Sequence, residues 1–170
     1  MREIRLIPLG GLGEIGKNMM LLECGPDDIV IDCGLSFPEE DMPGVDLVIP
    51  DVSYLLERRD RIRAIVLTHG HEDHVGALPY VLKDINVPVY GTRLTLGLAR
   101  RKMDELFEGN FDFRVVAPRD IVSFGSIQVQ FFRVTHSVSD SVGLLIGTPA
   151  GTIIHTGDFK LDQTPVDGQT

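Results

Sequence analysis

The sequence has no tryptophan, and none of its apolar runs is long. No stretch approaches the roughly 20 apolar residues that a membrane-spanning helix needs, so no membrane partner is expected. The opening residues, MREIRLIPLGG, carry charges and no continuous apolar segment, which does not fit a secretory signal. The expected location is therefore cytoplasmic.

Cysteine and positive charge are also scarce. Cys24 and Cys33 match no zinc-ribbon spacing and cannot form a disulfide scaffold. They can approach each other across a hairpin, but without an export signal reduced, partly buried thiols are favoured. The 16 basic and 25 acidic residues leave a net charge of −9, which argues against a surface dominated by phosphate binding. Carboxylates that bind metal count in that sum. The basic clusters at 57–63 and 99–102 are expected to be solvated helix faces.

What is present fits one domain of 170 residues with a real core, since 43% of the residues are hydrophobic. Its β-rich start, βαβα middle and β-rich end predict an α/β fold with a mixed sheet or sheets. Strands are expected at 3–9, 19–24, 29–34, 63–67 and 87–91, followed by about four more after residue 111. Helices are expected at 52–61, 75–85 and 92–109, with Thr92 as N-cap and Gly109 as C-terminal stop, and turns or loops at 25–28 and 37–46.

Residues 11–16, GLGEIG, match the G-x-G-x-x-G pattern of dinucleotide-binding folds letter for letter. That site needs a helix to begin at the loop. Only the stretch from Lys17 to Cys24 separates Gly16 from the next glycine, and it suits a returning strand better than a helix. Asp32 then ends a further strand, so its spacing from the glycines is a coincidence. We expect a tight turn and no nucleotide cofactor.

The segment THGHEDH places His69, His71, Asp73 and His74 directly after a buried strand. Metalloprotease helices carry two histidines at i and i+4, whereas the i, i+2 spacing here suits an extended turn. There His69 and His71 can face one ion while Asp73 and His74 face another, and imidazole with carboxylate suits Zn²⁺ and related ions. The alternative is a polar loop with accidental histidines.

Two later residues complete this set. His136 and Asp158 each follow a predicted strand, and alone they would be a structural histidine and a turn residue. Beside the first cluster, His136 supplies a third nitrogen, and a carboxylate such as Asp158 can bridge two ions roughly 3.5–4 Å apart. His155 is expected to support the ligands or to pack, not to ligate.

THGHEDH, the TH at 135–136 and HTGD at 155–158 resemble successive motifs of the metallo-β-lactamase superfamily. PLGGLGEIGKNM, DCGLSFP, HGHEDHVGALPY, THSVSDSVGL and HTGDFKLDQTPVDG are similar to the ribonuclease J family of its β-CASP branch. The resemblance covers essentially the whole chain and implies an αβ/βα sandwich. It assigns His69, His71 and His136 to one metal, Asp73 and His74 to a second, and Asp158 to a bridge. Asp73, His74 and Asp158 would thus be catalytic, with Glu14, Asn18 and Ser137 on the rim of the site.

The resemblance implies a ribonuclease that uses a two-metal-bound hydroxide on RNA phosphodiesters, as a 5′–3′ exonuclease, an endonuclease or both, in RNA maturation and decay. The family's seventh ligand, its β-CASP domain and its C-terminal dimerisation region would follow residue 170. Residues 1–170 are therefore expected to be the N-terminal part of such a domain, weakly active or inactive alone and one ligand short at the second metal. Homo-oligomers would form through the absent regions. Ser139 stands where the family has proline.

Two other functions stay open. A small-molecule hydrolase of the same fold, such as a thioesterase, would show the same ligand cluster. A non-catalytic RNA-binding or assembly subunit would be expected to lose ligands, yet all six expected in this span are present. The ligand set favours Zn²⁺ and also tolerates Mn²⁺.

Overall fold

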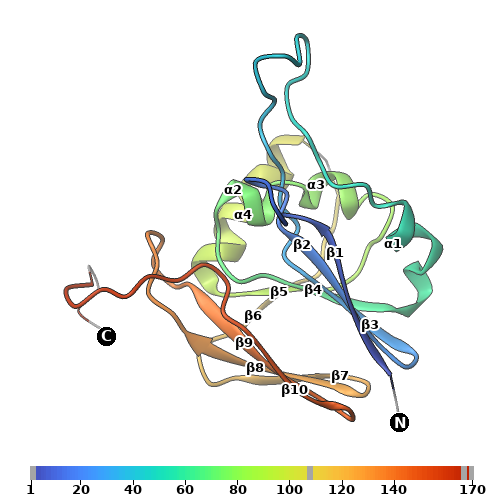
Figure 1. Ribbon diagram of the computed structural model, residues 1–170, viewed down its shortest axis with the longest axis vertical. Helices are drawn as coiled ribbons and strands as arrows, with labels where there is room; N and C mark the ends of the chain where they lie inside the picture. The colour runs from blue at the N-terminus through green and yellow to red at the C-terminus, as the bar shows by residue number, and fades with distance from the viewer. Residues whose placement is uncertain (1–2, 107–108, 166–167, 169–170) are drawn as a thin grey trace.

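The computed structural model describes residues 3–106, 109–165 and 168, which form two facing β-sheets with helices on the outer face of the larger one (Figure 1). The larger sheet has the order β1-β2-β3-β4-β5-β6 and the smaller the order β10-β9-β8-β7. The strands of the larger sheet are β1 Ile4–Gly10, β2 Met19–Cys24, β3 Asp27–Ile31, β4 Ile62–Val66, β5 Val89–Gly91 and β6 Phe113–Val115. Those of the smaller sheet are β7 Ile121–Phe124, β8 Ile127–Arg133, β9 Val142–Thr148 and β10 Gly151–His155.

The helices all come from the first two thirds of the chain. They are α1 Ser53–Glu57, α2 Glu72–Val75, α3 Leu78–Val81 and α4 Arg93–Leu106, with a 3₁₀ turn at Arg59–Arg61. In place of the single helix expected over 75–85 there are two short helices: α2, which begins earlier, and α3, with a turn at Gly76 and Ala77 between them. Gly76 has no room for a side chain, because a Cβ there would lie 2.5 Å from the Glu72 carbonyl oxygen.

The glycine loop joins β1 and β2, which pair antiparallel as a hairpin, and β2 pairs antiparallel with β3. No helix follows the loop, so the dinucleotide pattern is indeed a coincidence. From β3 to β6 the strands run parallel. The smaller sheet is antiparallel throughout. The chain is therefore an α/β sandwich of one mixed and one antiparallel sheet, within the α/β class that the sequence predicts.

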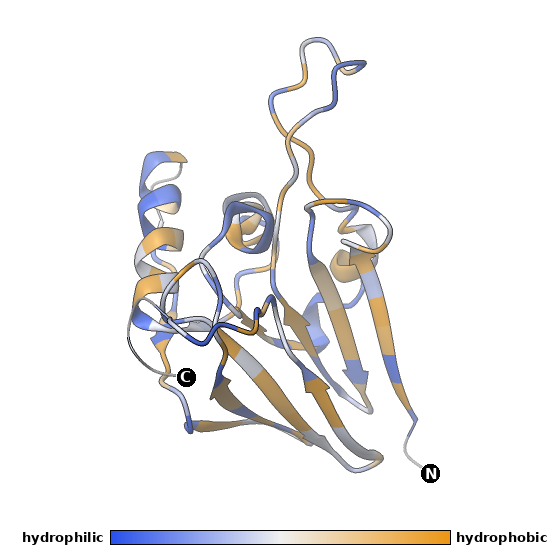
Figure 2. Cartoon of the chain, turned by 60° about the vertical axis from the view of Figure 1, so that its left-hand side comes forward, coloured by the Kyte–Doolittle hydropathy of each residue, from blue (hydrophilic) through white to orange (hydrophobic). Residues whose placement is uncertain are grey.

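The central strands β2 to β5 of the larger sheet are buried on both faces, which explains their nearly continuous apolar sequences (Figure 2). Neighbouring residues of one strand face opposite layers: Leu21 and Val30 pack with the helices, whereas Leu22 and Ile29 pack against the smaller sheet. Phe131 of β8 fills the layer between the sheets.

The sequence predicts a turn over residues 25–28, and this prediction is wrong for residues 27 and 28. Asp27 and Asp28 belong to β3 and are buried, leaving only Gly25 and Pro26 as the turn. Arginines make this possible: Arg63 donates to Asp27 at 2.9 Å, and Arg58 donates to Asp28 at 3.2 Å. Local composition predicts a turn. The two arginines, which lie 30 and 36 residues further along the chain, instead allow Asp27 and Asp28 to form the beginning of β3.

Both cysteines are reduced and completely buried, so the expected thiols are confirmed but are deeper than expected. They do not meet across the β2–β3 hairpin. Cys24 opposes Asp27 beside the turn and packs between the sheets, whereas Cys33 follows β3 and packs beneath the helices. Burial raises the pKa of the Cys33 thiol well above its usual value.

Candidate metal centre

The metal-type side chains gather at one end of the sandwich because of strand direction. In the larger sheet, β3 and β4 are parallel, so Asp32 and the segment after β4 lie at the same edge. In the smaller sheet, β8 and β10 both run antiparallel to β9, so His136 and Asp158 also leave the sheet at one shared end. The two ends meet, and segments more than 60 residues apart form one cluster.

The first group consists of His69, His71 and His136. The Nδ1 atom of His71 lies 3.0 Å from His69 Nε2 and 3.2 Å from His136 Nε2. One ligand atom from each of these residues lies within 4.8 Å of the others. Three ring nitrogens this close to one another can together act as ligands of one cation.

The second group adds Asp158 and His74 beside the first. A group of His69, His74 and Asp158 also has ligand atoms within 4.8 Å of one another. Asp158 Oδ2 lies 3.6 Å from His74 Nε2 and 3.9 Å from His136 Nε2, so the carboxylate stands between the two groups. Asp73 Oδ2 lies 3.6 Å from His74 Nε2. All six residues singled out from the sequence are thus brought together.

Asp32 belongs to this cluster, although the sequence gives it no part in the site. Its buried carboxylate lies 2.8 Å from His74 Nδ1 and accepts the Thr68 N–H at 2.8 Å and the Thr68 hydroxyl at 2.9 Å. The Thr68 hydroxyl lies in turn 3.0 Å from His69 Nδ1. Because the hydroxyl proton goes to Asp32, His69 Nδ1–H is the donor to Thr68. The sequence feature that points to this pair is an acid, Asp32, after one apolar strand and a threonine, Thr68, after the next.

This network fixes the ring tautomers that metal binding needs. When the Nδ1 atoms of His69 and His74 carry their protons toward Thr68 and Asp32, both Nε2 atoms keep a lone pair for the cluster. The residues present therefore fit a cation in each group. Imidazole and carboxylate donors suit Zn²⁺ and related divalent ions, and the set alone does not select one of them.

The protonation preferences of the histidines follow from burial. Burial above all, together with the neighbouring His74, lowers the pKa of His69 to about 3. Burial also lowers the pKa of His136. For His74 burial acts in the same sense, but the Asp32 carboxylate outweighs it, so the pKa of His74 is raised. His69 and His136 are thus kept neutral, the form that binds metal.

Of the three residues expected on the rim, Asn18 and Ser137 contact ligand-type side chains. The Asn18 side-chain amide donates to the Asp73 carbonyl and carboxylate, both at 3.1 Å, and lies 3.1 Å from His74 Nε2. Ser137 Oγ is 3.4 Å from His71 Nε2. Glu14 instead closes its own loop by accepting the Gly11 N–H at 3.1 Å. His155 accepts the Gly157 N–H at 3.2 Å and belongs to neither ligand group of the described residues.

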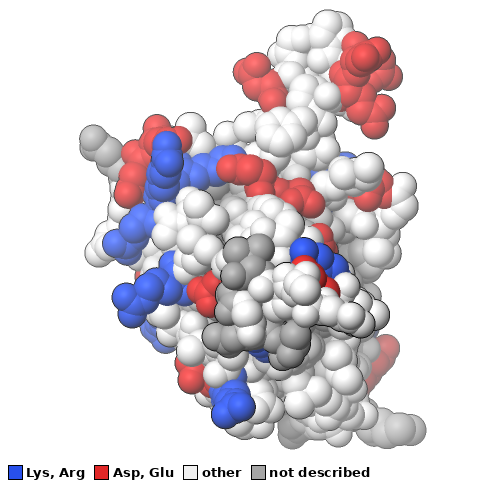
Figure 3. Space-filling model, turned by 90° about the vertical axis from the view of Figure 1, so that its left-hand side faces the viewer, with Lys and Arg blue, Asp and Glu red and all other residues white. Residues whose placement is uncertain are grey.

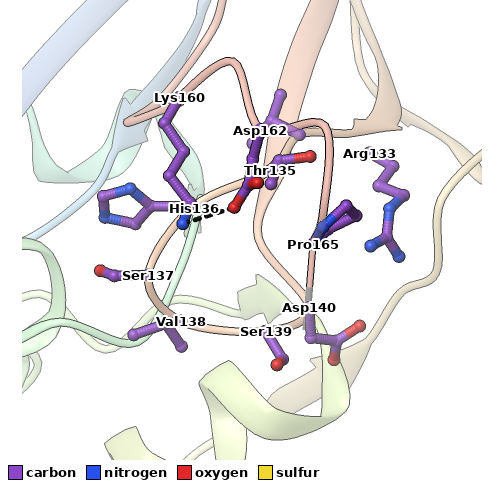
Figure 4. A pocket seen from close by; sticks show the side chains of 11 residues that line it. Arg133, Thr135, His136, Ser137, Val138, Ser139, Asp140, Lys160, Asp162 and Pro165 are labelled. Atoms are coloured by element: carbon purple, nitrogen blue, oxygen red, sulfur yellow. Dashed lines mark ion pairs between the residues drawn. The ribbon is translucent and has the colours of Figure 1, made fainter. Parts of the chain in front are cut away.

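Two hollows flank the cluster. One of about 300 Å³ opens beside His74, between the glycine loop and residues 154–158. A smaller one of about 110 Å³ lies behind His136, where Lys160 pairs with Asp162 at 2.8 Å (Figure 4). The cluster is therefore open to solvent-borne ligands on more than one side.

Fold and site together define a class. Residues 12–167 match the model of the Metallo-beta-lactamase superfamily, and the chain belongs to that superfamily. Among solved structures, a protein of unknown function from Enterococcus faecalis V583 has a TM-score of 0.72 at 24% identity, covering 95% of this chain and 44% of that one. The metallo-beta-lactamase fold protein YhfI from Bacillus subtilis has a TM-score of 0.65 at 17% identity, covering 96% of this chain and 66% of that one.

Within that class the chain is similar to the N-terminal portion of ribonuclease J proteins. It is 53% identical to Ribonuclease J of Thermus thermophilus, over 98% of this chain and 30% of that protein. It is 52% identical to Ribonuclease J of Helicobacter pylori strain 26695, over 96% of this chain and 24% of that protein. For Ribonuclease J2 of Bacillus subtilis the identity is 49%, over 98% and 30%. The chain thus spans less than a third of these relatives. Among its described helices, none has the length and apolar character to cross a membrane.

Proposed function

We propose that the chain is the metal-binding part of a metal-dependent ribonuclease, working within a longer protein. The observation that carries the proposal is the pair of adjoining ligand groups, His69–His71–His136 and His69–His74–Asp158, with Asp73 beside them. Identity of about half with ribonuclease J proteins over nearly the whole chain supports RNA as the substrate.

Each group has a distinct part in this proposal. His69, His71 and His136 would hold one divalent ion through neutral nitrogens. His74 and Asp73 would hold a second, with the Asp158 carboxylate, which stands between the groups, available to both. Bound ions would supply Lewis acidity, which activates water and offsets charge on phosphate oxygens. Zn²⁺ is favoured and Mn²⁺ is the alternative.

The neighbouring residues prepare these ligands. Asp32 and Thr68 hold the rings of His74 and His69 with their Nε2 atoms toward the cluster. Asn18 holds the Asp73 carboxylate. We further propose that one more ligand for the second ion comes from outside residues 1–170, so that this chain alone binds that ion weakly and has little activity. Cytoplasmic location, a β-CASP domain and homo-oligomers belong to the same proposal for the longer protein.

The net charge of −9 does not oppose an RNA substrate, because the charge is unevenly placed. An arm formed by residues 37–48 carries four acids and no base, and it projects away from the sandwich (Figures 1 and 3). On the face shown in Figure 3, basic side chains gather away from that arm. Part of the acidity therefore lies on a projecting segment, and part is the metal-type carboxylates themselves.

The test uses the longer protein, stripped with EDTA and reloaded with Zn²⁺ or Mn²⁺, on 5′-monophosphorylated RNA. Asp73→Asn should lower cleavage at least about 100-fold, because it replaces the carboxylate ligand that Asn18 orients with a neutral amide. Asp84→Asn is the matched control, since Asp84 is an exposed aspartate outside both ligand groups. It should cleave like the unaltered protein.

Three outcomes would contradict the proposal. Undiminished cleavage by the Asp73→Asn protein would exclude the metal mechanism. Absence of RNA cleavage, with metal-dependent hydrolysis of a thioester or a small phosphodiester, would favour a small-molecule hydrolase of the same fold. Binding of RNA without any hydrolysis would favour a non-catalytic subunit.

A further inference from the structure

The loop that follows His136 is fastened to a distant helix by one side chain. Asp140, at the end of that loop, accepts a hydrogen bond through Oδ2 from the Leu94 N–H at 3.3 Å. Leu94 lies in the first turn of α4, 46 residues earlier in the chain. Figure 4 shows the loop leaving His136 and ending at Asp140 beside this helix.

The contact caps the N-terminus of α4. The N–H groups of a first helical turn have no partner within the helix. Thr92, the expected N-cap, directs its hydroxyl to Thr95 Oγ1 at 2.9 Å instead of accepting a backbone N–H. The Asp140 carboxylate thus supplies an acceptor from outside the helix, and its negative charge suits the positive end of the helix dipole.

The backbone of the loop is arranged around this contact. Asp140 has a φ of 70°, a left-handed conformation that Asp, Asn and Gly tolerate and that Ala does not favour. The next residues close the loop: Ser141 Oγ donates to the Val138 carbonyl at 2.8 Å, and Val142 N–H donates to the Thr68 carbonyl at 2.9 Å. The loop is therefore tied both to α4 and to the residue before His69.

His136 depends on its loop more than His69 does. His69 is buried and anchored by Thr68, whereas His136 is only partly buried. The His136 ring Nε2 lies 3.2 Å from His71 Nδ1, which belongs to another ligand. We propose that Asp140 is a positioning residue: by capping α4 it holds the loop that sets His136 against His69 and His71. This inference rests on the proposed metal site.

The test measures Zn²⁺ affinity of the first site by competition with a chromophoric chelator, and the ligand field by Co²⁺ absorption. Asp140→Gly keeps the left-handed backbone but removes the carboxylate, and should weaken Zn²⁺ binding about tenfold and alter the Co²⁺ spectrum. Asp140→Asn keeps the backbone and an acceptor oxygen, and should remain within about threefold of the unaltered chain.

A second variant removes the other half of the contact. Leu94→Pro deletes the donor N–H at a first-turn position where proline is accommodated, and it leaves the loop sequence unchanged. It should weaken Zn²⁺ binding to a similar degree. Should Asp140→Gly fail to fold, this variant decides.

Asp120→Gly is the matched control. Asp120 also accepts a loop N–H through its carboxylate, from Ala117 at 2.8 Å, but it lies in the turn before β7. It should lower stability and leave Zn²⁺ affinity unchanged. Unaltered affinity in Asp140→Gly or Leu94→Pro, or an equal loss in Asp120→Gly, would overturn the inference, as would a chain that binds no Zn²⁺. Zn²⁺ binding without RNA cleavage would contradict the proposed function alone.

Discussion

A carboxylate is buried at each end of strand β3, and the two carboxylates have different hydrogen-bond partners. At its start, Asp28 is fully buried and bonded by Arg58 and Arg61, both at 3.2 Å. Just after its end, Asp32 is 2% exposed and bonded by Thr68 and His74. Both ends solve the problem of a buried charge, which is costly unless it is paired.

The partner decides what each end can do. A guanidinium is always protonated and has no lone pair, so Arg58 and Arg61 neutralise Asp28 and can bind no metal. An imidazole bonded through Nδ1–H keeps a lone pair on Nε2. Asp32 therefore orients the His74 ring so that its Nε2 lone pair faces the other ligand-type side chains, and this end of the sheet can bind a cation.

The carboxyl groups differ in their own acidity as well. Burial raises the pKa of Asp28, and this outweighs the opposing charges of Arg58 and Arg61. Burial acts on Asp32 in the same sense, but His74 and the Thr68 N–H outweigh it, so the pKa of Asp32 is lowered. The metal-site end thus holds the more firmly ionised carboxylate.

The largest expected effect lies at the arginine end. Asp28→Asn should lower the free energy of unfolding by about 3 kcal/mol, because Arg61 would lose its carboxylate partner and Arg58 would keep only Glu23. Zn²⁺ affinity should stay within about twofold, since neither arginine touches a ligand. Urea unfolding in EDTA and chelator competition measure the two quantities. A large loss of Zn²⁺ affinity in the folded variant would show that the two ends are not independent.

The next effect lies at the imidazole end. Asp32→Asn should weaken Zn²⁺ binding about 10–100-fold, because the His74 ring loses the charge that orients it and raises its basicity. The backbone should tolerate the change, since Asp32 has a φ of 59° and asparagine adopts this conformation readily. Isothermal titration with Zn²⁺ measures the effect. Retained affinity with an unmoved His74 ring would exclude an orienting part for Asp32.

The ease of prediction differs between the two ends for a physical reason. THGHEDH and the strand ends at His136 and Asp158 show their chemistry locally, because ligand-type side chains stand together after apolar runs. The roles of Asp28 and Asp32 cannot be read from the residues around them. Each aspartate depends on partners about 30 to 40 residues away, so local sequence predicts a turn at Asp28 and gives Asp32 no part in the site.

The sheets show the same division. The hairpin β1–β2 and the strand β4 follow from local apolar pattern and length. The short β6 pairs parallel with β5 and extends the larger sheet, although the sequence groups it with the strands that follow. Three residues, Phe113 to Val115, carry too little pattern to predict their sheet, and the pairing is decided by packing.

The smallest expected effect is a pH dependence at the imidazole end of the metal-free chain. With its pKa lowered to about 3, folded His69 stays neutral, while the unfolded chain takes up a proton below its ordinary value of 6.5. Stability should therefore fall as the pH falls through this window, by about 1 kcal/mol from pH 7.5 to 5.5. His136 acts in the same sense, whereas the raised pKa of His74 opposes it.

Comparing variants isolates the contribution of His69. In EDTA, the loss of unfolding free energy between pH 7.5 and 5.5 should be about 1 kcal/mol smaller for His69→Gln than for the unaltered chain. Asp28→Asn, although less stable, should keep the full pH dependence, because the guanidinium groups around it do not titrate in this range. Equal pH dependence in the unaltered chain and His69→Gln would contradict the assignment. A flattened profile for Asp28→Asn would instead show that the two ends of β3 share one electrostatic network.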